Sequence, residues 1–195
     1  VGYMNWALGG WQWLAVSLML FVTYTLLWPR SKDNDHPVHT VRAVASVAAP
    51  GMIWLLVLLE NNRMGGVFEP FVFSYVAHSV MVGMSQLGYV KPEQSVHRRI
   101  LTAISRSWLV FVPLFFLRLV SNGNIEQLFA SPEILRAVSA AILAIPLLLA
   151  VAFLHQRLIR KYGDNERAYG RWLGRGAIAG GMSVLLFLLL GFGSN

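Results

Sequence analysis

Cysteine is absent from all 195 residues of the sequence. The chain therefore forms no disulfide, holds no thiol redox centre and offers no thiolate ligand to a metal. Acidic residues are also scarce, with nine Asp and Glu against sixteen Lys and Arg, and only 13% of all residues are charged. Soluble domains carry about 25% charged residues. This chain has too few charges to cover an ordinary water-exposed surface.

Long apolar runs take the place of those charges. Apolar side chains make up 56% of the sequence, and the mean hydropathy is +0.56. Runs of about 20 apolar residues are typical of helices that cross a membrane. We expect an all-α polytopic protein with one integral membrane domain, residues 1–195, and about six transmembrane helices. The predicted spans are Trp6–Trp28, Ala43–Leu59, Phe68–Tyr89, about Ile100–Val120, a helix from Ser131 to Gly163, and Ala177–Phe192.

Basic residues are concentrated between these spans and predict the topology. Thirteen of the sixteen Lys and Arg fall in three predicted turns, at 29–42, 91–106 and 155–175. Short turns rich in Lys and Arg stay on the cytoplasmic side. We therefore predict three helical hairpins in the bacterial inner membrane, a multi-pass arrangement with both termini outside. The same clustering accounts for the net charge of +7 without invoking nucleic acid.

The most basic turn, His155–Arg175, also predicts a surface for partners. Clustered cations at a membrane face attract anionic lipids and acidic protein surfaces. We expect contacts with membrane lipids and with another membrane or cytoplasmic protein, and a homo-oligomer is left open. The cations assigned to this surface are Arg160, Lys161, Arg167 and Arg171.

His78 is the sharpest candidate for a ligand contact. It falls near the middle of a predicted span, and an ionisable residue at that depth is a functional hypothesis by default. The alternative is a neutral imidazole that bonds a neighbouring helix. Three charged residues, Glu69, Arg63 and Arg118, are predicted at the outer ends of the spans. Together with His78 they form the predicted ligand-binding set, in which an Arg pairs with an anionic group.

Enzyme motifs are scarce. The sequence has no Gly-rich phosphate loop, no H-E-x-x-H and no G-x-S-x-G. We assign no catalytic residue, no metal and no cofactor. His39, His97 and His155 are predicted near the inner face, too far from His78 for a haem with two His ligands. One phrase, Lys161-Tyr-Gly-Asp164 followed by Tyr169, resembles the tail of membrane isoprenylcysteine methyltransferases, but a further apolar run follows it here.

A longer stretch, about residues 39–168, carries several motifs in order. These are His39-Thr-x-Arg42, Val67-Phe-x-Pro-Phe-x-Phe-x-Tyr75, Gly83, and the pair Pro132 and Pro146 before a basic exit. In this order they resemble the multi-span input domain of bacterial hybrid sensor histidine kinases that detect diffusible fatty-acid signals. The resemblance implies a membrane sensor whose basic exit passes the signal to a cytoplasmic domain.

The sequence thus favours a membrane-embedded input module for an apolar or amphipathic signal that enters from the outer leaflet. Three alternatives stay open: an accessory subunit of a larger membrane complex, a small transporter or channel, and an enzyme. A sensor predicts a closed bundle with a lipid-sized groove. The chain starts at Val1 rather than Met and lacks the basic start of a signal peptide, which fits a processed or excised piece.

Overall fold

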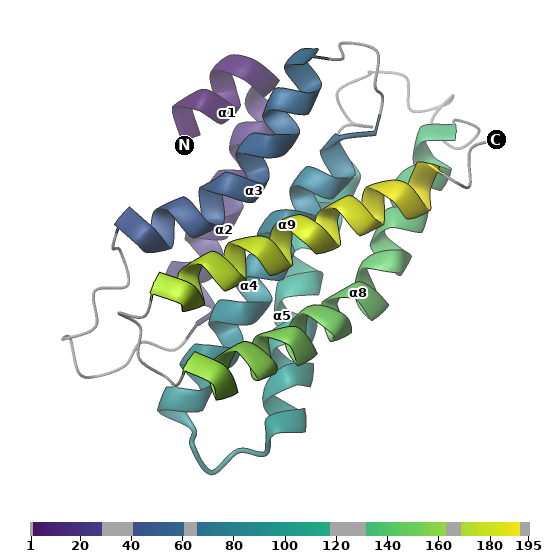
Figure 1. The fold of residues 1–195 in the computed structure, drawn as a ribbon. Helices are drawn as coiled ribbons and strands as arrows, with labels where there is room; N and C mark the ends of the chain where they lie inside the picture. Colours follow the sequence, from purple (N-terminus) through teal and green to yellow (C-terminus); the bar gives the residue numbers. More distant parts are fainter. Residues whose placement is uncertain (1, 29–40, 61–65, 118–131, 163–168, 192–195) are drawn as a thin grey trace.

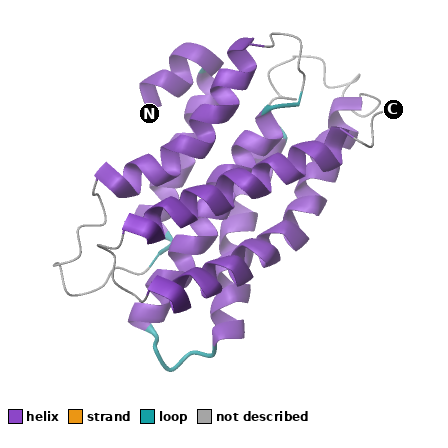
Figure 2. Cartoon of the chain, in the orientation of Figure 1, coloured by secondary structure: helices purple, strands orange, loops and turns teal. Residues whose placement is uncertain are grey.

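The computed structural model describes residues 2–28, 41–60, 66–117, 132–162 and 169–191, except the side chains of 41–44 and 169. Every regular element within these ranges is an α-helix, as Figure 2 shows, and this confirms the all-α prediction. The helices are α1 (Gly2–Gly9), α2 (Trp11–Leu26), α3 (Val41–Glu60), α4 (Phe68–Val90), α5 (Val96–Phe115), α8 (Pro132–Tyr162) and α9 (Tyr169–Gly191).

The N-terminal segment is broken, where one helix from Trp6 to Trp28 was predicted. Gly10 has a φ of 79°, a left-handed conformation that glycine adopts without a Cβ clash. The chain reverses there, and α1 packs against α2. Asn5 of α1 donates hydrogen bonds to Ser17 and to the Tyr75 hydroxyl on α4. These bonds anchor the first helix to the bundle.

Helix α4 lies at the centre of the bundle. It packs against α2, α3, α5, α8 and α9, and every side chain from Phe68 to Ser85 is buried. A helix that is apolar nearly all round is stable only when other helices cover every side. At Gly83 the Trp28 indole lies so close that an added Cβ would sit 2.4 Å from a ring carbon. The Trp28 ring therefore packs directly on the surface of α4 at Gly83.

The helices alternate in direction along the bundle. Figure 1 shows the turn at 91–95, the C-terminal end of α8 and the N-terminal ends of α3 and α9 at one end, at the lower left. The opposite ends of α3, α4, α8 and α9 lie together at the upper right. The predicted basic turns therefore adjoin one end of the bundle, which we call the basic end.

Two helices are long and apolar enough to cross a membrane. These are α8, over Pro132–Tyr162, and α9, over Gly170–Gly191. The apolar stretches Trp11–Leu26 and Ala45–Glu60 are shorter. Helix α4 contains Glu69, His78 and several serines. These polar side chains are buried, because other helices of the bundle pack around α4. Within the part of the chain that the structure describes, two helices thus have the length and apolar composition of membrane-spanning helices, where six were predicted.

Much of the basic stretch 155–175 is helical, as the predicted helix from Ser131 to Gly163 required for its first part, whereas α9 begins before the predicted span Ala177–Phe192. Helix α8 continues to Tyr162 and α9 begins at Tyr169, so only 163–168 separate them. Arg, Lys and Leu are good helix formers, and the positive charge of this stretch does not oppose a helix. The two helices also pack closely there, because an added Cβ at Gly174 would lie 2.5 Å from Leu158.

Candidate ligand groove and an interior basic cluster

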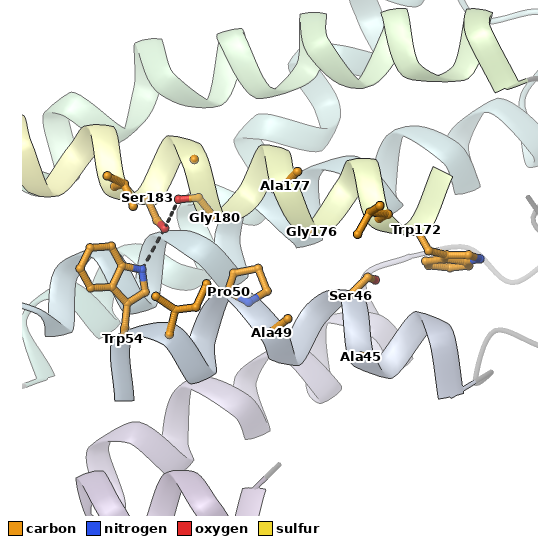
Figure 3. Close-up of a pocket in the computed structure, with 14 residues that line it drawn as sticks. Ala45, Ser46, Ala49, Pro50, Trp54, Trp172, Gly176, Ala177, Gly180 and Ser183 are labelled. Atoms are coloured by element: carbon orange, nitrogen blue, oxygen red, sulfur yellow. Dashed lines mark hydrogen bonds between the residues drawn. The ribbon is translucent and has the colours of Figure 1, made fainter. Parts of the chain in front are cut away.

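An apolar groove runs between α3 and α9 and has a volume of about 600 Å³. Figure 3 shows it from the side, with small residues on the facing surfaces of both helices. It extends from Ala45 and Trp172, near the basic end, to Trp54 and Val184. The full lining is Ala45, Ser46, Ala49, Pro50, Ile53, Trp54, Trp172, Leu173, Gly176, Ala177, Gly180, Gly181, Ser183 and Val184.

Glycines on α9 set the width of the groove. An added Cβ at Gly176 would meet the Ser46 carbonyl oxygen at 3.4 Å, so the two backbones are close at this level. At Gly180 the nearest atom is a Pro50 side-chain carbon at 3.8 Å, and at Gly181 there is nothing within 4 Å. Helices α3 and α9 therefore touch near the basic end and leave open space farther along.

The polar groups in the wide part of the groove already have partners. The Trp54 indole Nε1 donates to Ser183 Oγ at 2.9 Å, and the Ser183 hydroxyl donates to the Gly180 carbonyl at 2.7 Å, the chain of bonds drawn in Figure 3. A ligand in this part of the groove contacts an apolar wall, and these polar groups need no hydrogen bond from the ligand. The groove is therefore suited to a hydrocarbon chain rather than to a polar solute.

Trp172 connects this groove to the protein interior. Its ring lines the groove, and the Arg175 guanidinium carbon lies 4.8 Å from the ring centroid. A guanidinium at this distance from an indole is attracted to it electrostatically. The contact holds a cation directly behind the groove wall.

Behind this wall lies a group of buried polar side chains that we call the interior basic cluster: His78, Ser85, His155, Arg171 and Arg175. Arg175 and Arg171 donate from Nη2 to Ser85 Oγ at 2.7 and 3.2 Å. His155 Nε2 lies 3.2 Å from the same oxygen. Both arginines are almost fully buried, at 1% and 0% exposure. Three helices, α4, α8 and α9, thus converge on one serine hydroxyl.

His78 occupies the same interior. It is 1% exposed, and within the described residues neither ring nitrogen has a hydrogen-bond partner. It interacts electrostatically with Arg175 and with His155. It lies near the middle of α4, surrounded by protein in the centre of the bundle, and it does not line the groove.

The other members of the predicted ligand-binding set lie elsewhere. Glu69 is buried and forms an ion pair with Arg136 at 3.5 Å, and Arg136 donates to the Gly66 carbonyl at 3.0 Å. Nine residues separate Glu69 from His78, or about 13.5 Å along a helix. Arg63 and Arg118 lie outside the described residues. The structure therefore does not bring Glu69 and His78 to one site.

The four residues of the predicted partner surface do not share one environment. Arg160 and Lys161 are exposed at the end of α8, and Arg167 lies outside the described residues. Arg171 was predicted to face lipid or a partner, and this is wrong because its side chain is fully buried. Helix α9 starts earlier than predicted, so Arg171 belongs to its first two turns and points at α4.

Sequence reasoning missed the groove and most of the cluster. Arg171 and Arg175 are spaced i, i+4, which places both on one face of a helix. That signal was present but was assigned to a turn. His155 was placed near the inner face, whereas α8 buries it beside Ser85. Nothing in the sequence selects Ser85, because a serine is common in helices and its role depends on which side chains lie near it in the fold.

Neither site contains a recognisable set of metal ligands. Among the residues that the structure describes, no group of three or more His, Cys, Asp or Glu could hold a metal ion. Comparisons with protein-family models, with curated proteins and with solved structures find no match. The function must therefore be argued from the groove and the cluster.

Proposed function

We propose that the chain is a membrane-embedded sensory or input module that binds an apolar or amphipathic signal molecule in the α3/α9 groove. The groove carries this proposal: its volume of about 600 Å³ lies within the roughly 300–1,000 Å³ of small-molecule sites. Its polar groups are satisfied internally. Each methylene transferred into such a site contributes about 0.8 kcal/mol.

The position of the groove revises the route of the signal. The groove starts at Ala45 and Trp172, near the basic end of the bundle. If the basic end is cytoplasmic, as the Lys and Arg pattern predicts, the narrow part of the groove at Gly176 lies on the inner-leaflet side, and the open part at Gly181 lies near the middle of α9. We therefore place the ligand chain beside the middle of α9, and not in the outer leaflet that the sequence favoured.

The apolar outer faces of the bundle support a multi-pass protein. Large apolar side chains are exposed on several helices, including Phe21 on α2, Leu56 on α3, Leu109 on α5 and Phe153 on α8. Exposed apolar faces on this scale are costly in water and normal in lipid. In this proposal α2, α3, α4 and α5 cross the inner membrane with α8 and α9, and both termini are outside.

Signal transfer follows from the two faces of α9. One face lines the groove, and the other packs on α4 and α8. A chain seated against Gly180 and Gly181 would press α9 toward α4 and shift the ends of α8 and α9. Arg160 and Lys161, exposed at that end, would present the change to a cytoplasmic partner.

One observation favours a second candidate, an accessory subunit of a larger membrane complex. Leu135, Ile142 and Leu149 on α8 are all exposed and recur every seven residues, the spacing of a helix-packing seam. A partner helix on this seam would define a subunit. Cross-linking from Ile142→Cys in native membranes would capture that helix, whereas a sensor that acts alone would yield no heterologous product.

The proposed function is tested by binding of the fluorescent fatty acid cis-parinaric acid to the full chain in a neutral detergent. Gly181→Phe fills the groove at a position where a Cβ meets nothing within 4 Å. Gly191→Phe is the matched control, since its added Cβ is equally open and it lies outside the groove. We expect Gly181→Phe to raise Kd on the order of tenfold, worth about 1.4 kcal/mol. Equal Kd values for the two variants would refute the groove as the site.

A further inference from the structure

We propose that α1 is a lipid-contacting helix whose exposed aromatic face lies in the membrane leaflet at the end of the bundle opposite the basic end. This surface, which we call the α1 aromatic face, consists of Tyr3, Met4 and Trp6, with 73%, 41% and 52% of their surfaces exposed. The inference rests on the multi-pass part of the proposed function. It does not depend on the groove, because α1 contributes no residue to the groove lining.

The polarity of α1 is the reverse of that of a helix on a water-exposed surface. Its one buried residue is the polar Asn5, whereas Tyr3, Met4 and Trp6 point away from the protein. A surface helix in water buries its apolar side chains and leaves its polar side chains in the solvent. In a membrane, a polar side chain instead bonds a neighbouring helix and apolar side chains face the lipid. The arrangement of α1 therefore fits hydrocarbon surroundings.

Specific contacts hold α1 in this orientation. Asn5 donates a hydrogen bond to the Tyr75 hydroxyl on α4 at 3.3 Å. At Gly9 an added Cβ would overlap the Trp13 indole, so the end of α1 packs directly on that ring. Trp13 in turn packs on Phe71 of α4, with the ring centroids 4.2 Å apart. The α1 aromatic face is therefore a defined surface of the folded protein.

The same contacts place α1 along the bundle. Trp13 packs on Phe68 and Phe71 at the start of α4, and this end of α4 lies opposite the basic end (Figure 1). Tyr75, the partner of Asn5, is seven residues farther along α4, or about 10 Å. The eight residues of α1 extend about 12 Å, less than half of the roughly 30 Å hydrocarbon core. Residues 2–9 therefore lie within one leaflet.

The composition of this segment favours lipid over a protein partner. Residues 1–28 contain no Asp, Glu, Lys, Arg or His, so they offer no charge that could pair with a partner. The Tyr3 and Trp6 rings are neighbours, with centroids 6.0 Å apart. Tyr and Trp favour the boundary between acyl chains and headgroups, where the ring is in apolar surroundings and its O–H or N–H reaches an acceptor. Leu18 and Phe21, exposed on the neighbouring helix α2, have the same apolar character.

The test uses spin labels on the full chain in phosphatidylcholine nanodiscs. Because the chain has no cysteine, Tyr3→Cys and Trp6→Cys each provide a single labelling site. Collisions of the label with oxygen, which concentrates in hydrocarbon, are compared with collisions with a water-soluble nickel chelate. The matched controls are Phe21→Cys, on the exposed face of α2, and Pro92→Cys, in the exposed turn between α4 and α5. We expect both α1 labels to favour oxygen, as Phe21→Cys does, and Pro92→Cys to favour nickel.

The other outcomes separate this inference from the proposed function. Nickel-accessible labels on α1, with an oxygen-accessible label at Phe21→Cys, would overturn the inference and leave α2 in the membrane. Labels on α1 that neither reagent reaches would also overturn it, because a protein partner then covers the face. A nickel-accessible label at Phe21→Cys would contradict the multi-pass proposal as well. Both α1 positions are exposed, so a misfolded variant at one of them leaves the other to decide the result.

Discussion

Trp172 and Arg175 join the two sites of this molecule, with the guanidinium carbon 4.8 Å from the centre of the indole ring. One residue lines the groove and the other belongs to the interior basic cluster. A ligand that displaces the Trp172 ring must therefore disturb Arg175, and through it Ser85. This contact links the groove to the centre of the bundle.

The hydrogen bond between Trp54 and Ser183 should hold α3 against α9. Ser183→Ala leaves the buried Trp54 Nε1 without its acceptor, and we expect a loss of about 1–3 kcal/mol in the free energy of unfolding. Trp54→Phe removes the donor and part of the contact with Phe187. Unfolding in mixed micelles of the two single variants and the double variant should give a coupling energy of about 1 kcal/mol. Strictly additive losses would show that the bond contributes nothing.

Two glycine-to-alanine changes should act in opposite directions. At Gly83 the new methyl group would lie 2.4 Å from the buried Trp28 ring, so we expect a loss of about 1–3 kcal/mol from overpacking. At Gly181 nothing lies within 4 Å, and alanine should stabilise the helix by about 0.5–1 kcal/mol. Thermal unfolding of both variants checks this pair. A lowered midpoint for Gly181→Ala would mean that α9 needs that glycine for a contact that the described residues do not show.

The sequence predicted the helices better than the sites. Apolar runs located α3, α4 and α8 to within a few residues, because burial of apolar side chains determines where helices form. The Lys and Arg residues of His155–Arg175 were assigned to a cytoplasmic turn. The preference of basic residues for the cytoplasmic side predicts topology, but it does not predict how helices pack. Charge alone does not reveal that Arg171 faces inward.

The groove lay beyond sequence reasoning for a different reason. Two small residues four positions apart, such as Gly176 and Gly180, are typical of a close helix contact, and the structure has one at Gly176. The open space beside Gly181 depends on how α3 and α9 diverge, which the spacing does not encode. Likewise, His78 was recognised by its depth, whereas Ser85 and His155 became candidates only when α8 and α9 placed charged groups around them.

Exposed and buried cations at the basic end should behave differently. The double variant Arg160→Gln, Lys161→Gln removes two exposed charges, each worth on the order of 1 kcal/mol toward anionic lipid. We expect native mass spectrometry to detect fewer retained phosphatidylglycerol molecules, with an unchanged unfolding midpoint. Arg171→Gln should instead lower the midpoint, because it removes a buried donor to Ser85. If Arg171→Gln affects lipid retention alone, the burial of Arg171 is in doubt.

The topology offers the broadest test of the proposed function. The turn at 91–95 and the ends of α8 and α9 that flank 163–168 lie at one end of the bundle (Figure 1), and the Lys and Arg rule places that end in the cytoplasm. A reporter active only in the cytoplasm should therefore give no signal when fused to Asn195. The same reporter inserted at Pro92, in the exposed turn between α4 and α5, should be active and serves as the control. Activity at Asn195 with silence at Pro92 would invert the protein in the membrane, placing Arg160 and Lys161 outside the cell.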